Sequence, residues 1–229
     1  LAALEPALAE RFGEALHLFG EAWLDPLVVM AALARALRES GASWQRAEVN
    51  RVGAGFVEAD GIRHGCDWAF DCRGLGARGE VPGLRGVRGE VIRLHAPEVE
   101  LCHMVRLMHP RYRLYVVPRR GRDFVIGATQ IESDDPGPIT VRSALELLSA
   151  LYSLHPGFAE ARVTATAANC RPAFADNLPR LLTAPGLLRI NGLFRHGFLL
   201  APALAEAALA RLGGAASGCE ELFCEEVPA

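Results

Sequence analysis

The chain contains no lysine. All 24 of its basic residues are arginines, set against 27 acidic residues, which gives a formal net charge of −3 without any basic cluster. Proteins that bind nucleic acid or anionic membranes by general electrostatics carry an excess of basic residues on one surface. The composition therefore argues against both kinds of partner.

Long hydrophobic runs are also absent. The nearly uncharged runs 24–34 and 198–205 are too short to span a bilayer, and Asp25 interrupts the first of them. We therefore expect no membrane helix. The chain begins at Leu1 inside a helical pattern, and residues 1–20 contain neither a basic region nor a small-residue cleavage site, so we expect it to be part of a longer chain.

The six cysteines form no recognisable disulfide or metal pattern. None belongs to a CxxC pair, and a chain of this length does not depend on disulfides for its stability. His95, His103 and His109, together with Cys102, match no tetrahedral ligand spacing. We expect reduced thiols in a cytoplasmic protein, and no metal site.

The whole chain has the composition of an ordinary globular protein, with 51% hydrophobic and 22% charged residues, and its 229 residues suit one large domain or two smaller ones. The first part of the chain predicts helices followed by short strands. Apolar spacing predicts a helix over 4–19 and a second helix that begins at Asp25-Pro26 and ends before Gly41. The β-like runs 48–52, 55–59 and 67–72 predict a meander that ends in a buried strand.

The second part predicts a sheet followed by a helical return. The alternating segments 89–94, 105–109, 113–118 and 123–129 indicate a mainly antiparallel sheet, covered by a helix over 141–152. A strand at 162–168, a turn-rich stretch at 172–186, a strand at 187–191 and an Ala/Leu helix after Gly197 follow. Residues 215–229 are small, polar and acidic, and we expect them to be loosely held.

A glycine-rich segment follows the predicted strand 67–72. Gly74-Leu75-Gly76-Ala77-Arg78-Gly79 satisfies the G-x-G-x-x-G pattern of dinucleotide-binding turns. In such a turn the glycines open a helix, whereas Pro82 and Gly83 follow here. The pattern leaves two interpretations open, a phosphate-binding loop and a plain turn after a buried strand, and it favours the turn.

The junction at 193–199 is more informative. The helix after Gly197 begins with free backbone amides and a partial positive charge, which favour an electron-rich ligand group. Arg195 precedes this helix, and Arg171 ends a strand before Pro172. Arginines in such positions either bind a carboxylate through two parallel hydrogen bonds or form ordinary surface ion pairs, and both interpretations stay open.

Four motifs then follow one another at characteristic spacing. They are Tyr115-Val116-Val117-Pro118-Arg119, Val125-Ile126-Gly127-Ala128-Thr129, Cys170-Arg171-Pro172 and Phe194-Arg195-His196-Gly197-Phe198-Leu199-Leu200-Ala201-Pro202. In order and spacing they resemble the C-terminal part of the glycine oxidase and D-amino-acid oxidase family of flavoproteins, most closely the glycine oxidases of the thiamin pathway. Asp25-Pro26, the run through Val49, and Cys72-Arg73-Gly74-Leu75-Gly76-Ala77 are similar to the middle of the same family. The resemblance covers residues 16–212 and does not include the family's N-terminal dinucleotide-binding segment.

The resemblance implies an α/β plus α+β fold, namely part of a Rossmann-type FAD-binding domain with an inserted antiparallel-sheet substrate domain. The FAD-binding parts would be 1–85 and 170–214, the substrate domain 86–169, and the tail 215–229. In the family, Val49 lies against the adenosine of FAD, with the turn of Cys72, Gly74 and Gly76 nearby. The isoalloxazine ring would be wrapped by Leu193, Phe194, Arg195, His196, Gly197, Phe198 and Leu199.

The activity implied by the resemblance is the FAD-dependent oxidation of a small, glycine-like amino acid or amine to its imine, with O2 as electron acceptor and H2O2 as product. Arg171 would bind the carboxylate, Tyr115 would donate its hydroxyl to it, and Arg195 would add a second positive charge. Three other interpretations stay open: a D-amino-acid dehydrogenase, the flavin domain of a tRNA-modifying oxidoreductase, and a truncated, non-catalytic binding module. The sequence leaves a homo-oligomer open.

Overall fold

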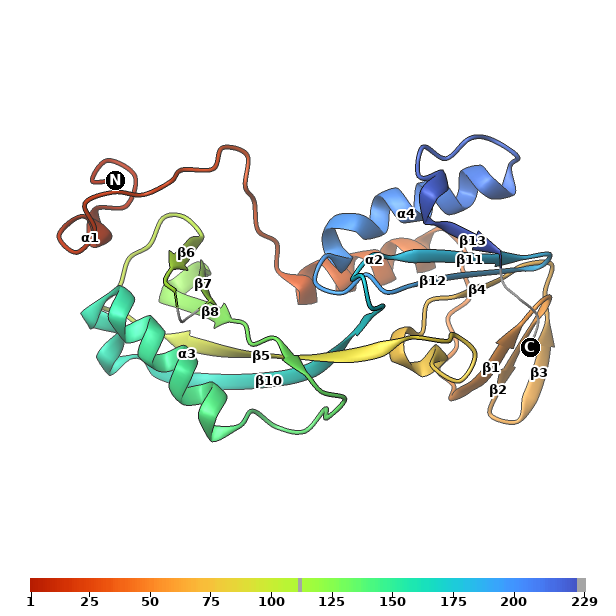
Figure 1. Ribbon diagram of the computed structural model, residues 1–229, viewed down its shortest axis with the longest axis horizontal. Coiled ribbons are helices and arrows are strands. Elements are labelled where there is room, and N and C mark those ends of the chain that lie inside the picture. The colour runs from red at the N-terminus through yellow and green to blue at the C-terminus, as the bar shows by residue number, and fades with distance from the viewer. Residues whose placement is uncertain (111–112, 226–229) are drawn as a thin grey trace. The chain divides into compact units, whose positions relative to one another are not determined.

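The computed structural model describes residues 1–110 and 113–225, and these form two compact units. Of the described residues, the first unit comprises those within 1–44, 88–131 and 136–169, and the second comprises those within 45–87, 132–135 and 170–225. Both units mix helices with sheets, and the order of elements along the chain is shown in Figure 1. The predicted combination of α/β and α+β architecture is confirmed.

A six-stranded sheet forms most of the first unit. Its strands follow the order β10-β5-β8-β7-β6, and β9 pairs with β5 beside this path. The bounds are β5 Arg85–His95, β6 Val105–Met108, β7 Arg113–Pro118, β8 Asp123–Gly127, β9 Ile131–Glu132 and β10 Arg162–Ala173. The pairs β5·β8, β7·β8 and β6·β7 are antiparallel, as the alternating sequence pattern predicts.

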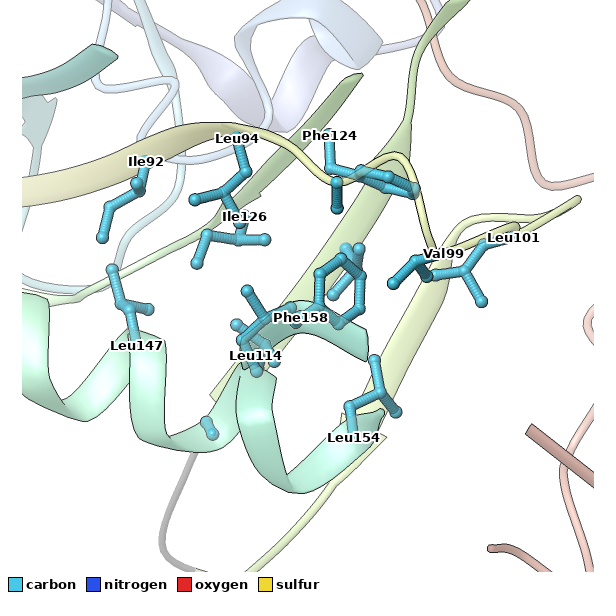
Figure 2. Close-up of a cluster of buried hydrophobic side chains, with 14 of the residues drawn as sticks. Ile92, Leu94, Val99, Leu101, Leu114, Phe124, Ile126, Leu147, Leu154 and Phe158 are labelled. Carbon is cyan, nitrogen blue, oxygen red and sulfur yellow. The ribbon is translucent and has the colours of Figure 1, made fainter. Parts of the chain in front are cut away.

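One face of this sheet is buried beneath α3 (Val141–Leu154) and the short helix η3 (Pro156–Glu160). Because side chains alternate between the two faces of a strand, Leu114 and Val116 share the buried face with Phe124 and Ile126. The helix contributes three leucines to the same core, and the labelled side chains from both sides meet in Figure 2. The Thr140 hydroxyl caps α3 by accepting the Ser143 N–H at 3.2 Å. The three leucines of α3 in this core are Leu147, Leu151 and Leu154. The predicted covering helix is thus confirmed.

The second unit contains two small sheets. Strands β1 (Val49–Gly53), β2 (Phe56–Ala59) and β3 (Ile62–Gly65) form an antiparallel meander. A four-stranded sheet has the order β13-β11-β12-β4, with β4 Ala69–Asp71, β11 Arg180–Ala184, β12 Leu187–Asn191 and β13 Phe223–Glu225. Helix α4 (Gly197–Leu212) packs Leu204 and Ala208 against Leu181 and Leu188 of this sheet.

Several element predictions are wrong in instructive ways. Only Pro6–Ala9 (α1) of the predicted helix 4–19 is helical, because Pro6 lacks an amide donor and Gly13 interrupts the pattern. The run 67–72 does not end the meander: β3 closes it, and β4 pairs in parallel with β12 instead. The stretch 172–186 contains β11, whose prolines flank the strand and therefore leave its hydrogen bonds intact.

The tail also differs from the expectation. Residues 223–225, within the segment expected to be loosely held, form β13 and pair in parallel with β11. Phe223 packs against the core of Leu181, Leu188 and Leu204, and this apolar contact is the physical reason for the order. Residues 226–229 of the same predicted tail lie outside the described residues.

Helix α2 (Pro26–Glu39) has the predicted start, because the Asp25 carboxylate accepts the Leu27 N–H at 2.9 Å. Together with α1 it groups with the first unit, and Leu8 of α1 packs into the core of that unit. The unit boundaries between 87 and 88 and between 169 and 170 lie close to the predicted domain limits. The assignment of residues 1–85 to one FAD-binding domain stays a prediction.

Candidate functional site

The N-terminus of α4, in the second unit, is the candidate ligand site. Its N-cap residue, His196, makes no side-chain capping hydrogen bond. The first amides of a helix have no partner within the helix, so they are available to a ligand here. Nothing lies within 4 Å of the position that a Cβ would take at Gly197, so the backbone can be approached closely. The Phe198 and Leu199 side chains beside it are 48% and 76% exposed.

The end of β10 lies directly against this junction. The Phe194 N–H donates a hydrogen bond of 3.0 Å to the carbonyl oxygen of Pro172, the residue after Arg171. Phe194 has a φ of 51°, which is rare for a side chain of this size. The sharp bend brings the two predicted motifs, 170–172 and 194–202, together in one unit. Arg171 is half-buried on β10, and Arg195 is exposed next to the N-cap of α4.

The glycine-rich turn belongs to the same cluster. Residues Gly74–Ala77 form the short 3-10 helix η1, as the plain-turn interpretation predicts, and no longer helix follows. Gly74 has a φ of 58°, and a Cβ there would lie 3.5 Å from the Pro172 ring. The turn therefore packs beside the strand end that carries Arg171.

Asn191 connects the turn with the α4 junction, and the sequence pattern did not indicate it. Its side-chain amide donates to the Gly74 carbonyl at 2.9 Å, and its Oδ1 accepts the Gly192 N–H at 2.8 Å. The residue is 1% exposed, so both hydrogen bonds are shielded from water. A lone Asn that ends an apolar strand and precedes glycine is the only signal by which it could have been found.

A network of largely buried charged side chains holds the glycine-rich turn against β4 and β12. Arg73 donates two hydrogen bonds of 2.9 Å to the Asp71 carboxylate, and Arg189 of β12 contacts both Asp71 and Glu80. Arg189 also donates to the Val52 carbonyl of β1 at 2.9 Å. Although burial by itself raises it, hydrogen bonds from Arg73 and the charges of both arginines lower the pKa of Asp71. The network fixes β4, η1 and β12 to one another.

Two other predicted cofactor residues lie near β4 and β1. Cys72 follows β4, is exposed and directly precedes the Arg73 network. Val49 is half-buried on β1 and packs against the cluster of Val52, Ala69 and Leu187. Val49 packs in the same cluster as Leu187, which begins β12, whereas the α4 junction follows Asn191, which ends it. These two strand ends lie about 13 Å apart. The structure thus groups the η1, β10 and α4 residues and leaves Val49 away from them.

Tyr115 belongs to the first unit, on the sheet face opposite the α3 core. It pairs with Gly127 of β8 and with Arg106 of β6. The loop before α2 covers part of this face, since Glu21 accepts a hydrogen bond of 2.6 Å from Arg106 and the Trp23 ring lies 4.3 Å from the Arg119 guanidinium carbon. Burial and the nearby Arg93 charge lower the pKa of Arg119 below its ordinary value.

Within residues 1–110 and 113–225, no group of three or more His, Cys, Asp or Glu side chains is placed to hold a metal ion. No helix in this described part of the chain is long and apolar enough to cross a membrane.

Comparison with known proteins decides the family. Over residues 1–211 the chain matches the DAO family, described as FAD dependent oxidoreductase. The chain belongs to the FAD-dependent oxidoreductase family. It is 50% identical over 212 residues to a Rhizobium etli protein named as a thiamine biosynthesis oxidoreductase, ThiO, and this match covers 93% of the chain and 62% of the relative. Glycine oxidase of Geobacillus kaustophilus is 30% identical over 218 residues, which cover 87% of the chain and 56% of the relative.

Solved structures of two oxidases share the fold. The crystal structure of the Geobacillus kaustophilus glycine oxidase superposes with a TM-score of 0.71 at 26% identity, over 81% of this chain and 53% of that one. Iminodiacetate oxidase from Chelativorans superposes with a TM-score of 0.75 at 24% identity, over 89% of this chain and 59% of that one. The chain therefore spans less than two thirds of the length of these relatives.

The α4 junction fits the cofactor of the FAD-dependent oxidoreductase family. Its uncapped first turn offers donors and positive potential, and the open space at Gly197 allows a planar ring to approach the backbone. The exposed apolar side chains of Phe198 and Leu199 suit the remainder of such a ring. The Asn191 bridge and the Asp71 network, which the sequence analysis missed, hold the surrounding turns in place.

Proposed function

We propose that the protein to which this chain belongs oxidises the Cα–N bond of a small, glycine-like amino acid, with FAD as cofactor. The α4 junction is the observation that supports this most directly, because its free amides and glycine backbone lie beside a strand end that presents an arginine. Membership of the FAD-dependent oxidoreductase family supplies the cofactor. The similarity to a glycine oxidase and to a ThiO protein supports the substrate class.

Residues 193–199 hold the isoalloxazine ring in this proposal. The amides at the start of α4 would stabilise negative charge on the bound ring, because the helix dipole is positive there. The resemblance to the family assigns Val49, Cys72, Gly74 and Gly76 to the adenosine part of FAD. Of these, Gly74 packs against Pro172 beside the α4 junction, whereas Val49 packs near the start of β12. When bound, FAD supplies the acceptor for the two electrons of the amino acid.

Binding of the substrate carboxylate falls to three residues. Arg171 binds it through two parallel charged hydrogen bonds, and Arg195 adds a second positive charge from the α4 junction. The resemblance to the family assigns the Tyr115 hydroxyl to the same carboxylate. These groups orient the amino acid, and no acid or base is required of them when the amine arrives neutral.

The fate of the electrons and of the imine completes the proposal. Dioxygen accepts the electrons and leaves as hydrogen peroxide, and the imine of glycine enters thiazole assembly for thiamin. The second part rests on the name of the Rhizobium relative. The six free cysteines favour a reducing compartment, the cytoplasm.

An anaerobic visible spectrum of the protein made from its complete gene tests the proposal. A flavin band that bleaches on addition of glycine, and recovers on admission of air with formation of H2O2, is the expected result. Bleaching without recovery in air would replace the oxidase by a dehydrogenase that passes electrons to a carrier. A flavin band unaffected by glycine and by other small amino acids would overturn the proposed substrate, and absence of flavin would support a non-catalytic binding module.

A further inference from the structure

One row of residues crosses the sheet of the first unit on the face that carries Tyr115. Val91 of β5 pairs with Gly127 of β8, and Gly127 pairs with Tyr115 of β7. Directly opposed residues of antiparallel strands point to the same face. Val91 and Tyr115 therefore flank Gly127 on the face opposite the α3 core.

Both neighbours reach over the glycine. A Cβ at Gly127 would lie 2.6 Å from the Tyr115 hydroxyl oxygen, 2.8 Å from the ring carbon that bears it, and 2.9 Å from Cγ1 of Val91. The Tyr115 ring thus does not stand up from the sheet. It lies flat across β8, with its hydroxyl above the Gly127 backbone.

Any side chain at position 127 would displace this ring. The φ of Gly127 is not positive, so the glycine is not required by a left-handed backbone. Val91 has a short, β-branched side chain with restricted χ1 rotation and little freedom to withdraw. The long Tyr115 side chain, with its hydroxyl at the far end, is the group that would have to move.

We propose that Gly127 is a positioning residue that sets where the Tyr115 hydroxyl is presented, and hence how tightly a substrate carboxylate is bound. The role of Tyr115 in carboxylate binding rests on the proposed function, whereas the control of its position by Gly127 rests on the geometry of the sheet. In this proposal Gly127 acts through Tyr115 alone.

The first experiment follows the tyrosine itself by 19F NMR in protein labelled with 3-fluorotyrosine. The chain has three tyrosines, so Tyr115→Phe identifies the signal by its loss. Gly127→Ala is expected to shift that signal and leave the other two in place. Gly65→Ala is the matched control, since Gly65 also lies in a strand, has no positive φ and has nothing within 4 Å of its Cβ position.

The second experiment measures carboxylate binding in the FAD-loaded protein made from the complete gene. The probe is glycolate, which has the carboxylate of glycine without its amine, titrated by the change in flavin absorbance. Loss of a tyrosine hydrogen bond to a charged group weakens binding about 10-fold to 100-fold. Gly127→Ala and Tyr115→Phe should each show this loss, and the KM for glycine should rise in parallel.

The double variant Gly127→Ala/Tyr115→Phe isolates the coupling. If Gly127 acts only through Tyr115, the double variant binds glycolate no more weakly than Tyr115→Phe does. Additive losses, or an unshifted 19F signal in Gly127→Ala, would overturn the proposal. If Gly127→Ala does not fold, Gly127→Ala/Val91→Ala makes room on the β5 side, and the same shift and the same loss are expected of it.

The two proposals fail in different ways. If wild-type protein binds no glycolate while the Tyr115 signal still shifts in Gly127→Ala, the proposed function fails and the positional control stands. If wild-type protein binds glycolate and Gly127→Ala leaves both readouts unchanged, the positional control fails and the proposed function stands.

Discussion

At the scale of single residues, Glu90 shows how a buried charge is stabilised by hydrogen-bond partners. Glu90 of β5 has a fully buried side chain, and one of its carboxylate oxygens accepts hydrogen bonds of 3.0 and 2.8 Å from Arg88. The other accepts the Thr129 hydroxyl at 2.9 Å. Burial by itself raises its pKa, but hydrogen bonds from Ser143, Arg88 and Thr129 lower it below the ordinary value.

This lowered pKa predicts acid sensitivity. A carboxyl whose pKa is lower in the folded state contributes stability that is complete above its unfolded pKa, about 4.3, and is lost as the pH falls through the folded value. Glu90→Gln should therefore flatten the fall of the unfolding free energy below about pH 4.3. It should also cost about 3–5 kcal/mol at pH 7, since Arg88 is left buried without its counter-charge. Urea titrations from pH 3 to 7 measure both effects, and an unchanged slope would contradict the assignment.

Arg171 gives the prediction that bears most directly on the proposed function. In the FAD-loaded protein from the complete gene, Arg171→Ala should weaken transition-state binding by about 2–4 kcal/mol through loss of charged hydrogen bonds, mainly as a higher KM. Arg171→Lys keeps the charge but not the two parallel bonds, and should fall between wild type and Arg171→Ala. Steady-state kinetics with glycine measure the effect. A KM for glycine unchanged in Arg171→Ala would remove this residue from the site.

At the scale of secondary structure, sequence predicts the elements whose signals are local. Asp25-Pro26 and Thr140 begin α2 and α3 as expected, because capping acts within one turn. The partners of a strand are not local, so the run 67–72 gave no indication that β4 pairs with β12, more than a hundred residues away. The same limit applies to the candidate site. Motifs located Arg171 and the α4 junction, whereas Asn191 and the Asp71 network depend on tertiary contacts.

The turn between β12 and α4 depends on Gly192, whose φ is 78°. A Cβ there would overlap the ring of Phe174, which is 2% exposed. Gly192→Ala should lower the unfolding free energy by about 1–2 kcal/mol for the left-handed backbone and about 1–3 kcal/mol for overpacking. Gly214→Ala is the control, because its φ is 72° but nothing lies within 4 Å. Equal losses in the two variants, measured in urea, would show that the Phe174 contact does not matter.

At the scale of the whole molecule, apolar surface is distributed unevenly. Helix α2 has no buried residue, and its exposed large apolar side chains are Leu27, Val28, Met30, Leu33 and Leu37. In the 229-residue chain, Leu33→Gln should therefore change the unfolding free energy by less than about 0.5 kcal/mol. Leu151→Ala, in the core of the first unit, should cost about 2–5 kcal/mol. A large loss in Leu33→Gln would show that another surface covers α2 in solution.

If FAD binds elements of the second unit, it should slow hydrogen exchange in those elements and not elsewhere. A bound ligand stabilises the folded state by mass action. Backbone amides therefore exchange their hydrogens more slowly wherever the local opening that exposes them also requires the ligand to dissociate. In the protein from the complete gene, FAD should slow exchange in residues 74–77 and 193–200. Exchange in β6, β7 and β8, which contain no proposed FAD contact, should change little. Riboflavin, which lacks the adenosine part, should protect 193–200 and should protect 74–77 less than FAD does. Protection confined to the strands of the first unit would contradict the assignment, because the α4 junction would then make no contact with the flavin.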